Sequence, residues 1–164
     1  MNSSGELPSV VLKLTEQDLL TIPPRDIHPH LTSIDLSRNQ LSAVALAPLS
    51  RAGGGLVALN LADNDLRDLT QAAGVWEALG GLEDLDISAN CLSSLEGLSA
   101  LSSLTTLRAD DNQVTDLGSL HRLQYVRGGT PPGLSQLSSL SLARNHLSSV
   151  RLEVEGHQDH AAQL

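Results

Sequence analysis

Apolar residues recur along most of the chain in one pattern, Leu-x-x-Leu-x-Leu-x-x-Asn-x-Leu, in which Ile replaces Leu at some places. Four copies match the pattern fully, a fifth has Ala109 at its third apolar place, and a weaker copy comes first. The copies begin at Ser9, Leu31, Leu56, Leu82, Leu104 and Leu137. Each contains an apolar alternation of period two, which is typical of a short strand with one buried face. The pattern predicts about six similar units.

This pattern resembles the leucine-rich-repeat family over about residues 9 to 150. Successive copies begin 22, 25, 26, 22 and 33 residues apart. The short spacing, with an apolar residue at every third position from Leu92 to Leu104, resembles the intracellular class typified by a regulatory subunit of protein phosphatase 1. The resemblance implies an α/β fold: a curved solenoid of about six repeats. Its parallel β-sheet would lie on the concave side, with short helices, 3-10 turns and loops on the convex side.

The predicted domain organisation is simple. We expect a flexible N-terminus at 1–8, one leucine-rich-repeat domain at 9–155 and a disordered tail at 156–164. A surface loop is expected at about 121–133, where the last interval is about eleven residues longer; a partner contact is the alternative. The alternating segment 150–155 could add one strand, and no recognisable cap follows. Either the chain is an incomplete version of a longer protein or a partner covers the last unit.

The segments between strands differ from one another. A short helix is expected from Ala43 to Ser50, and another from Thr70 to Leu79, with Trp76 packed on the convex side. Between Leu19 and Leu31, three prolines favour an extended path over a helix. Ala109 is expected to leave its layer underfilled.

The recurring asparagines fall where the chain turns inward after each strand. An amide side chain carries both donors and an acceptor, so it can satisfy buried backbone groups of two neighbouring coils. We predict a structural ladder rather than a catalytic role for these residues: Asn39, Asn64, Asn90, Asn112 and Asn145.

The polar positions within and just after each strand are expected on the concave side. Seven are acidic and four are basic. The candidate protein-binding residues are Asp35, Arg38, Asp63, Asp84, Asp86, Arg108, Asp110, Asp111 and Arg144. One hypothesis is that this strip meets a basic partner surface, where charge complementarity sets rate and specificity. The alternative is that the charges only keep an open sheet face soluble.

Composition excludes several functions. Ten Lys and Arg against 19 Asp and Glu, without a basic run, argue against nucleic-acid binding. No stretch reaches about 18 apolar residues, so no membrane span is expected. Exposed acids such as Asp84 stay ionised and make poor proton donors. The segment 110–112 lacks the rest of a calcium loop. We therefore expect no catalytic residue, no metal and no cofactor.

The function favoured by the sequence is a non-catalytic protein-interaction module or scaffold, monomeric when unbound. By resemblance, the alternatives are a regulatory subunit that modulates a protein phosphatase and a cytoskeletal or axonemal adaptor. A third possibility is a truncated copy with no function of its own. With one cysteine, Cys91, no internal disulfide can form. The expected location is the cytoplasm, with cytoskeletal, ciliary or nuclear sites as alternatives.

Overall fold

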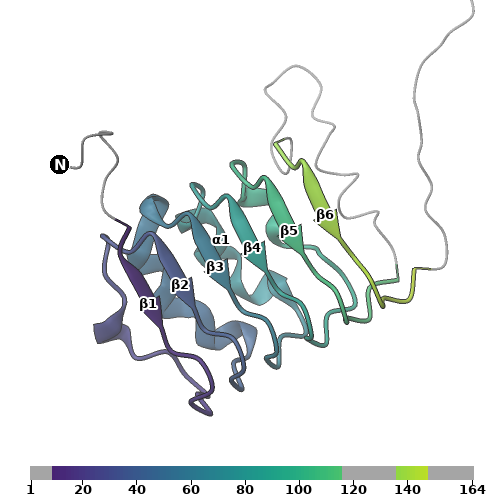
Figure 1. The fold of residues 1–164 in the computed structure, drawn as a ribbon, viewed down its shortest axis with the longest axis horizontal. Coiled ribbons are helices and arrows are strands. Elements are labelled where there is room, and N and C mark those ends of the chain that lie inside the picture. The colour runs from purple at the N-terminus through teal and green to yellow at the C-terminus, as the bar shows by residue number, and fades with distance from the viewer. Residues whose placement is uncertain (1–8, 116–135, 148–164) are drawn as a thin grey trace, which may run out of the picture.

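The computed structural model describes residues 9–115 and 136–147. Six three-residue strands form one parallel sheet in sequence order, and they lie side by side along a curved row (Figure 1). The strands are β1 Val11–Lys13, β2 Ser33–Asp35, β3 Ala58–Asn60, β4 Asp84–Asp86, β5 Thr106–Arg108 and β6 Ser139–Ser141. We number the coils 1 to 6 by the strand that each contains. The predicted curved α/β solenoid is confirmed.

The repeat sets the register of the sheet. Each strand pairs with the next so that equivalent residues face each other, as Leu59 faces Leu85 and Leu85 faces Leu107. These central residues point inward and are 2%, 0% and 0% exposed. A period-two strand buried on one face admits only this register, because a slip of one residue would turn every leucine outward.

Short helices cover the other side of the sheet (Figure 1). They are η1 Pro24–Asp26, η2 Ala43–Gly55, η3 Leu69–Ala72, α1 Ala73–Ala78 and η4 Leu98–Ala100, where η denotes a 3-10 helix. The helix expected over 43–50 is 3-10 and continues to Gly55, with a kink at Gly53 where φ is 63°. The helix expected over 70–79 is a 3-10 turn that leads into α1.

The expectation of an extended path between Leu19 and Leu31 is wrong at η1. Pro24 begins this 3-10 turn. Proline is well tolerated at the first helical position, since its fixed φ suits a helix and its missing N–H would have had no partner there. Proline is therefore compatible with a helix start, and Pro48 even lies inside the 3-10 helix η2.

The convex layer is tied to the core around Trp76. This side chain is 0% exposed, and its Nε1 donates to the carbonyl of Leu69 at 2.9 Å. Gly97 packs against the same segment with φ of 104°, and a Cβ there would lie 2.9 Å from the Leu69 carbonyl carbon and oxygen. The bond of Trp76 closes the convex segment of coil 3, and the contact of Gly97 packs coil 4 closely against it.

The core is one layer of aliphatic rows between the sheet and the convex segments. Ala109 lies in such a row and is fully buried. The two ends differ from the middle, because Leu12 and Leu14 of coil 1 are only partly buried and Leu140 of coil 6 is 41% exposed.

The predictions for 1–8, 121–133, 150–155 and 156–164 lie outside the described residues. In the described part of the chain, no helix combines the length and apolar character needed to cross a membrane.

Candidate protein-binding face

The buried asparagines join each coil to the one before it. Asn64 accepts the N–H of Leu41 at 2.9 Å and donates to the carbonyls of Leu36 and Leu61, both at 3.1 Å. The same arrangement recurs at Asn39, Asn90, Asn112 and Asn145. The first four of these five asparagines are at most 9% exposed. This row fixes where each strand ends.

The residue before each ladder position has a left-handed backbone conformation. These residues are Glu16, Arg38, Asp63, Ala89, Asp111 and Arg144, with φ between 52° and 58°. Such values are uncommon for residues other than glycine. Their recurrence in six coils shows that the turn, not the side chain, imposes them. Arg38, Asp63, Asp111 and Arg144 therefore lie in the turns that follow the strands.

A second polar row lies on the exposed face of the sheet, at the last residue of a strand. Asp35 Oδ1 accepts the N–H of Ser37 at 3.1 Å, and Asp86 Oδ1 accepts the N–H of Ser88 at 2.9 Å. Asn60 does the same for Ala62 at 3.0 Å. These N–H groups point away from the neighbouring coils, so the strand-end side chain supplies their acceptor. Asp35 and Asp86 thus have a structural role that sequence reasoning missed.

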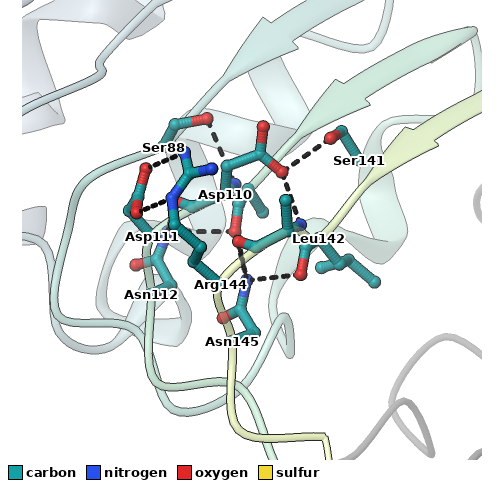
Figure 2. Close-up of polar contacts among 10 residues, drawn as sticks. Ser88, Asp110, Asp111, Asn112, Ser141, Leu142, Arg144 and Asn145 are labelled. Carbon is teal, nitrogen blue, oxygen red and sulfur yellow. Dashed lines mark hydrogen bonds and ion pairs between the residues drawn. The ribbon is translucent and has the colours of Figure 1, made fainter.

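In coils 5 and 6 the backbone N–H two residues after the strand end has a different acceptor, because Arg108 and Ser141 occupy the strand-end position. The N–H of Asp110 is bonded to Ser88 Oγ of the preceding coil at 3.2 Å. Asp110 Oδ1 in turn accepts from the N–H of Ala143 at 2.7 Å and from Ser141 Oγ at 2.6 Å (Figure 2). Asp110 therefore links the exposed faces of coils 5 and 6.

Ion pairs connect neighbouring coils along the same face. Arg108 Nη1 lies 2.7 Å from Asp84 Oδ1. Arg38 pairs with Glu16, and Arg144 pairs with Asp111 (Figure 2). The hydrogen bond from Arg144 lowers the pKa of Asp111, and the bond to Glu16 raises the pKa of Arg38. Three of the four basic groups on this face are thus already neutralised by adjacent acids.

The remaining acids leave the face negative. Within residues 9–115 and 136–147, Asp35, Asp63, Asp86 and Asp110 form no ion pair. Lys13 is the corresponding cation without an ion pair. The structure places Asp35, Asp84, Asp86 and Arg108 on strands, and the other five candidate residues in the turns after them.

A shallow hollow of about 230 Å³ lies over the middle of the sheet. Small side chains such as Ala58 leave space between the aspartates. Residues of the first five strands line it: Val11, Lys13, Ser33, Ile34, Asp35, Ala58, Leu59, Asn60, Asp84, Asp86 and Arg108. Asn60 and Lys13 were not among the candidate residues. Their position in the repeat, equivalent to Asp35, was the signal that could have identified them.

Chemical groups of other kinds are sparse. No three His, Cys, Asp or Glu side chains gather as a possible metal site in the residues that the structure describes. Cys91 is half-buried beside the ladder residue Asn90. The arrangement as a whole offers charge and shape to a macromolecule rather than a closed reaction chamber.

Comparison with known proteins gives the same picture. No protein-family model matches the chain. It is 28% identical over 179 residues to a protein phosphatase 1 regulatory inhibitor subunit PPP1R7 homolog of Arabidopsis thaliana, covering 87% of this chain and 53% of that one. It is 31% identical over 143 residues to leucine-rich repeat-containing protein 23 of Bos taurus, covering 83% and 40%. The chain thus spans about half or less of these relatives.

Solved structures agree on the fold. An internalin, InlF, of Listeria monocytogenes superposes with a TM-score of 0.56 at 23% identity, over 75% of this chain and 32% of the internalin. The leucine-rich repeat domain of APL1B gives a TM-score of 0.50 at 23% identity, over 84% and 32%. With its stacked coils and buried asparagine row, the chain is a leucine-rich-repeat protein that resembles the phosphatase 1 regulatory subunit type.

Proposed function

We propose that the chain is a non-catalytic protein-binding module whose concave face receives a basic surface of another protein. The observation that carries this proposal is the unpaired negative charge of Asp35, Asp63, Asp86 and Asp110. Arginines that could have neutralised this face are bonded to other acids. A basic partner would supply the missing counter-charge and would be steered toward it.

The geometry of the hollow supports the same proposal. Asp35 and Asp86 occupy equivalent places on β2 and β4, two strands apart, so their Cα atoms are about 10 Å from each other. Each carboxylate uses Oδ1 for a backbone N–H. These bonds restrict the side chains, so less rotamer freedom is lost on binding. Aromatic anchors are absent from the lining, so affinity should depend on charge and fall with salt.

The test removes charge without removing structure. Asn60 shows that an amide at the strand end still accepts the N–H two residues on. The variant Asp35→Asn, Asp63→Asn, Asp86→Asn, Asp110→Asn should therefore fold normally and lose four charges. Its matched control loses four charges elsewhere: Asp26→Asn, Asp65→Asn, Glu77→Gln and Glu96→Gln. Both are compared with the wild type in affinity capture from the native cells, at low and high salt.

The expected result is that the concave variant loses the salt-sensitive partners that the wild type and the control variant retain. Equal capture by all three chains, with equal salt dependence, would contradict the use of this face.

A second candidate function is regulation of a protein phosphatase. It is favoured by the similarity to a chain whose name describes a regulatory inhibitor subunit of protein phosphatase 1. The experiment adds the purified chain to a phosphatase 1 catalytic subunit and measures both binding and turnover. A change in turnover supports regulation, and binding without such a change supports a scaffold. Absence of binding removes the phosphatase as a partner.

The cellular location belongs to the same proposal. We place the chain in the cytoplasm, with cytoskeletal, ciliary and nuclear sites as alternatives that depend on its partner. Imaging of the tagged wild type beside the concave variant tests this, because a partner-dependent location should be lost in the variant alone.

A further inference from the structure

The outer edge of coil 6 exposes groups that every earlier coil covers. Leu140 is 41% exposed, whereas its equivalents Leu59, Leu85 and Leu107 are 0% to 2% exposed. Among the described residues, coils 2 to 5 each have a neighbouring coil on both sides, and coil 6 has one on one side only. An apolar sheet edge of this kind favours pairing with another strand.

Three backbone N–H groups of coil 6 also differ from their equivalents in the earlier coils. Those of Leu142, Arg144 and Leu147 have no partner among the described residues. In all five earlier coils the equivalent groups donate to the following coil: two to carbonyls, and the third to the ladder asparagine. Examples from coil 3 are Leu61 to Asp86 at 2.7 Å, Asp63 to Ser88 at 2.9 Å and Leu66 to Asn90 Oδ1 at 3.0 Å.

The opposite end of the solenoid carries the matching acceptors. In coil 2 the carbonyls of Asp35 and Ser37 accept these bonds from coil 1. Their equivalents in coil 1 are the carbonyls of Lys13 and Thr15, and the described residues contain no coil on that side of coil 1. Gln17 stands at the ladder position of coil 1 and is exposed, so its side-chain oxygen can serve in place of the asparagine oxygen.

Charge is complementary at the same two ends. The turn residues that precede the ladder position contact each other between neighbouring coils, as the Arg38–Glu16 and Arg144–Asp111 pairs show. If coil 1 of another chain followed coil 6, Glu16 would take the place next to Arg144. The row would then read Asp111, Arg144, Glu16, Arg38, with alternating sign.

We propose that two copies of this chain associate head to tail, with β6 of one pairing in parallel with β1 of the other. Extending the observed register places Val11 opposite Ser139, Leu12 opposite Leu140 and Lys13 opposite Ser141. Leu140 becomes covered, and no like charges meet in these strand pairs. The contact joins different surfaces, so it can repeat along a filament. It departs from the monomer that the sequence suggested, and it does not depend on the concave face.

The test blocks each end separately in the full chain. Leu140→Lys places a charge in the sheet edge of coil 6, and Arg144→Glu, at an exposed position, serves if the first variant does not fold. Val11→Pro with Glu16→Arg blocks coil 1, because proline is tolerated at the start of an edge strand and removes the donor that would face the second copy. Val44→Lys on η2, at a side chain that is 64% exposed, is the control at neither end.

Sedimentation velocity over a wide range of protein concentration gives the readout. The wild type and Val44→Lys should gain mass with concentration, and each blocked variant alone should remain a monomer. An equimolar mixture of the two blocked variants should form a species of two chains and nothing larger, because one complementary pair of ends remains. A wild type that stays monomeric, a blocked variant that still self-associates, or a mixture that stays monomeric would each overturn the proposal.

Discussion

Two rows of polar side chains satisfy backbone groups in successive coils, and they differ in burial. In the inner row Asn90 is 8% exposed and bonds to Leu66, Leu61 and Ile87. In the outer row Asp86 is partly exposed and accepts one N–H. Water can replace a bond in the outer row but not at the buried positions of the inner row.

This difference explains the residues at each position. From coil 2 onward the inner row is asparagine in every coil, since only a side chain with donors and an acceptor fits there. The outer row varies through Lys13, Asp35, Asn60, Asp86, Arg108 and Ser141. Where water can replace the side-chain hydrogen bond, residues of different charge can occupy the position. A binding surface can develop at such positions of a repeat scaffold.

The largest expected effect is in the middle of the inner row. Asn90→Ala leaves the buried N–H of Leu66 without a partner and removes one of the two side-chain bonds that the carbonyls of Leu61 and Ile87 each accept, so the free energy of unfolding should fall by about 2–4 kcal/mol. Urea unfolding followed by circular dichroism measures it. Asn60→Ala, the same substitution in the outer row, is the control and should cost about 1 kcal/mol. Equal losses would remove the distinction between the rows.

The next effect concerns the inner row at the open end. Asn145 makes the same bonds as Asn90 but is only partly buried. Water can reach the groups that Asn145→Ala exposes, and we expect a loss of about 1–2 kcal/mol. The measurement is made at low and high protein concentration. If Asn145→Ala lost as much unfolding free energy as Asn90→Ala at low protein concentration, burial would not determine the cost of this substitution in the inner row.

A smaller effect separates hydrogen bonding from charge in the outer row. Asp86→Ala removes the acceptor of the Ser88 N–H and should cost about 1 kcal/mol. Asp86→Asn keeps an acceptor, as Asn60 does in coil 3, and should leave stability within about 0.5 kcal/mol of the wild type. Thermal unfolding of both variants decides the point. If the two variants lost equal stability, the carboxylate charge and not the bond would be responsible.

The fold was predictable because one repeated spacing of leucines determines it. Leucines at fixed spacing imply one strand in each coil, and alternation within the strand allows one register, as Leu59 and Leu85 show. The convex segments carry no such period. There the local preference of Pro24 for a helix start decided the outcome, and the sequence reading weighed only its effect in a helix interior.

The candidate face was less predictable than the fold. Asp35 and Asp86 appeared as surface charges, and their second role depends on which backbone N–H groups point outward at the strand end. Asp or Asn at this place in three consecutive coils was the available signal. The ion pairs were harder to foresee, because Arg38 and Glu16 are 22 residues apart and meet only through stacking of coils.

The smallest effect concerns the ion pair at the end of the same face. The hydrogen bond from Arg144 holds the pKa of Asp111 below its ordinary value. A carboxyl whose pKa is lower in the folded state stabilises the fold above its unfolded pKa of about 3.9. That stability is lost as pH falls through the folded value.

Asp111→Asn should therefore lower the melting temperature slightly at neutral pH, and the difference from the wild type should vanish in acid. The effect is small because the pair is exposed and screened, and added salt should reduce it further. Asp63→Asn is the matched control, since Asp63 has the same left-handed backbone and forms no ion pair among the described residues. It should leave the melting temperature at neutral pH close to that of the wild type. A difference for Asp111→Asn that persists at low pH would assign its stability to backbone conformation in the turn rather than to the pairing with Arg144.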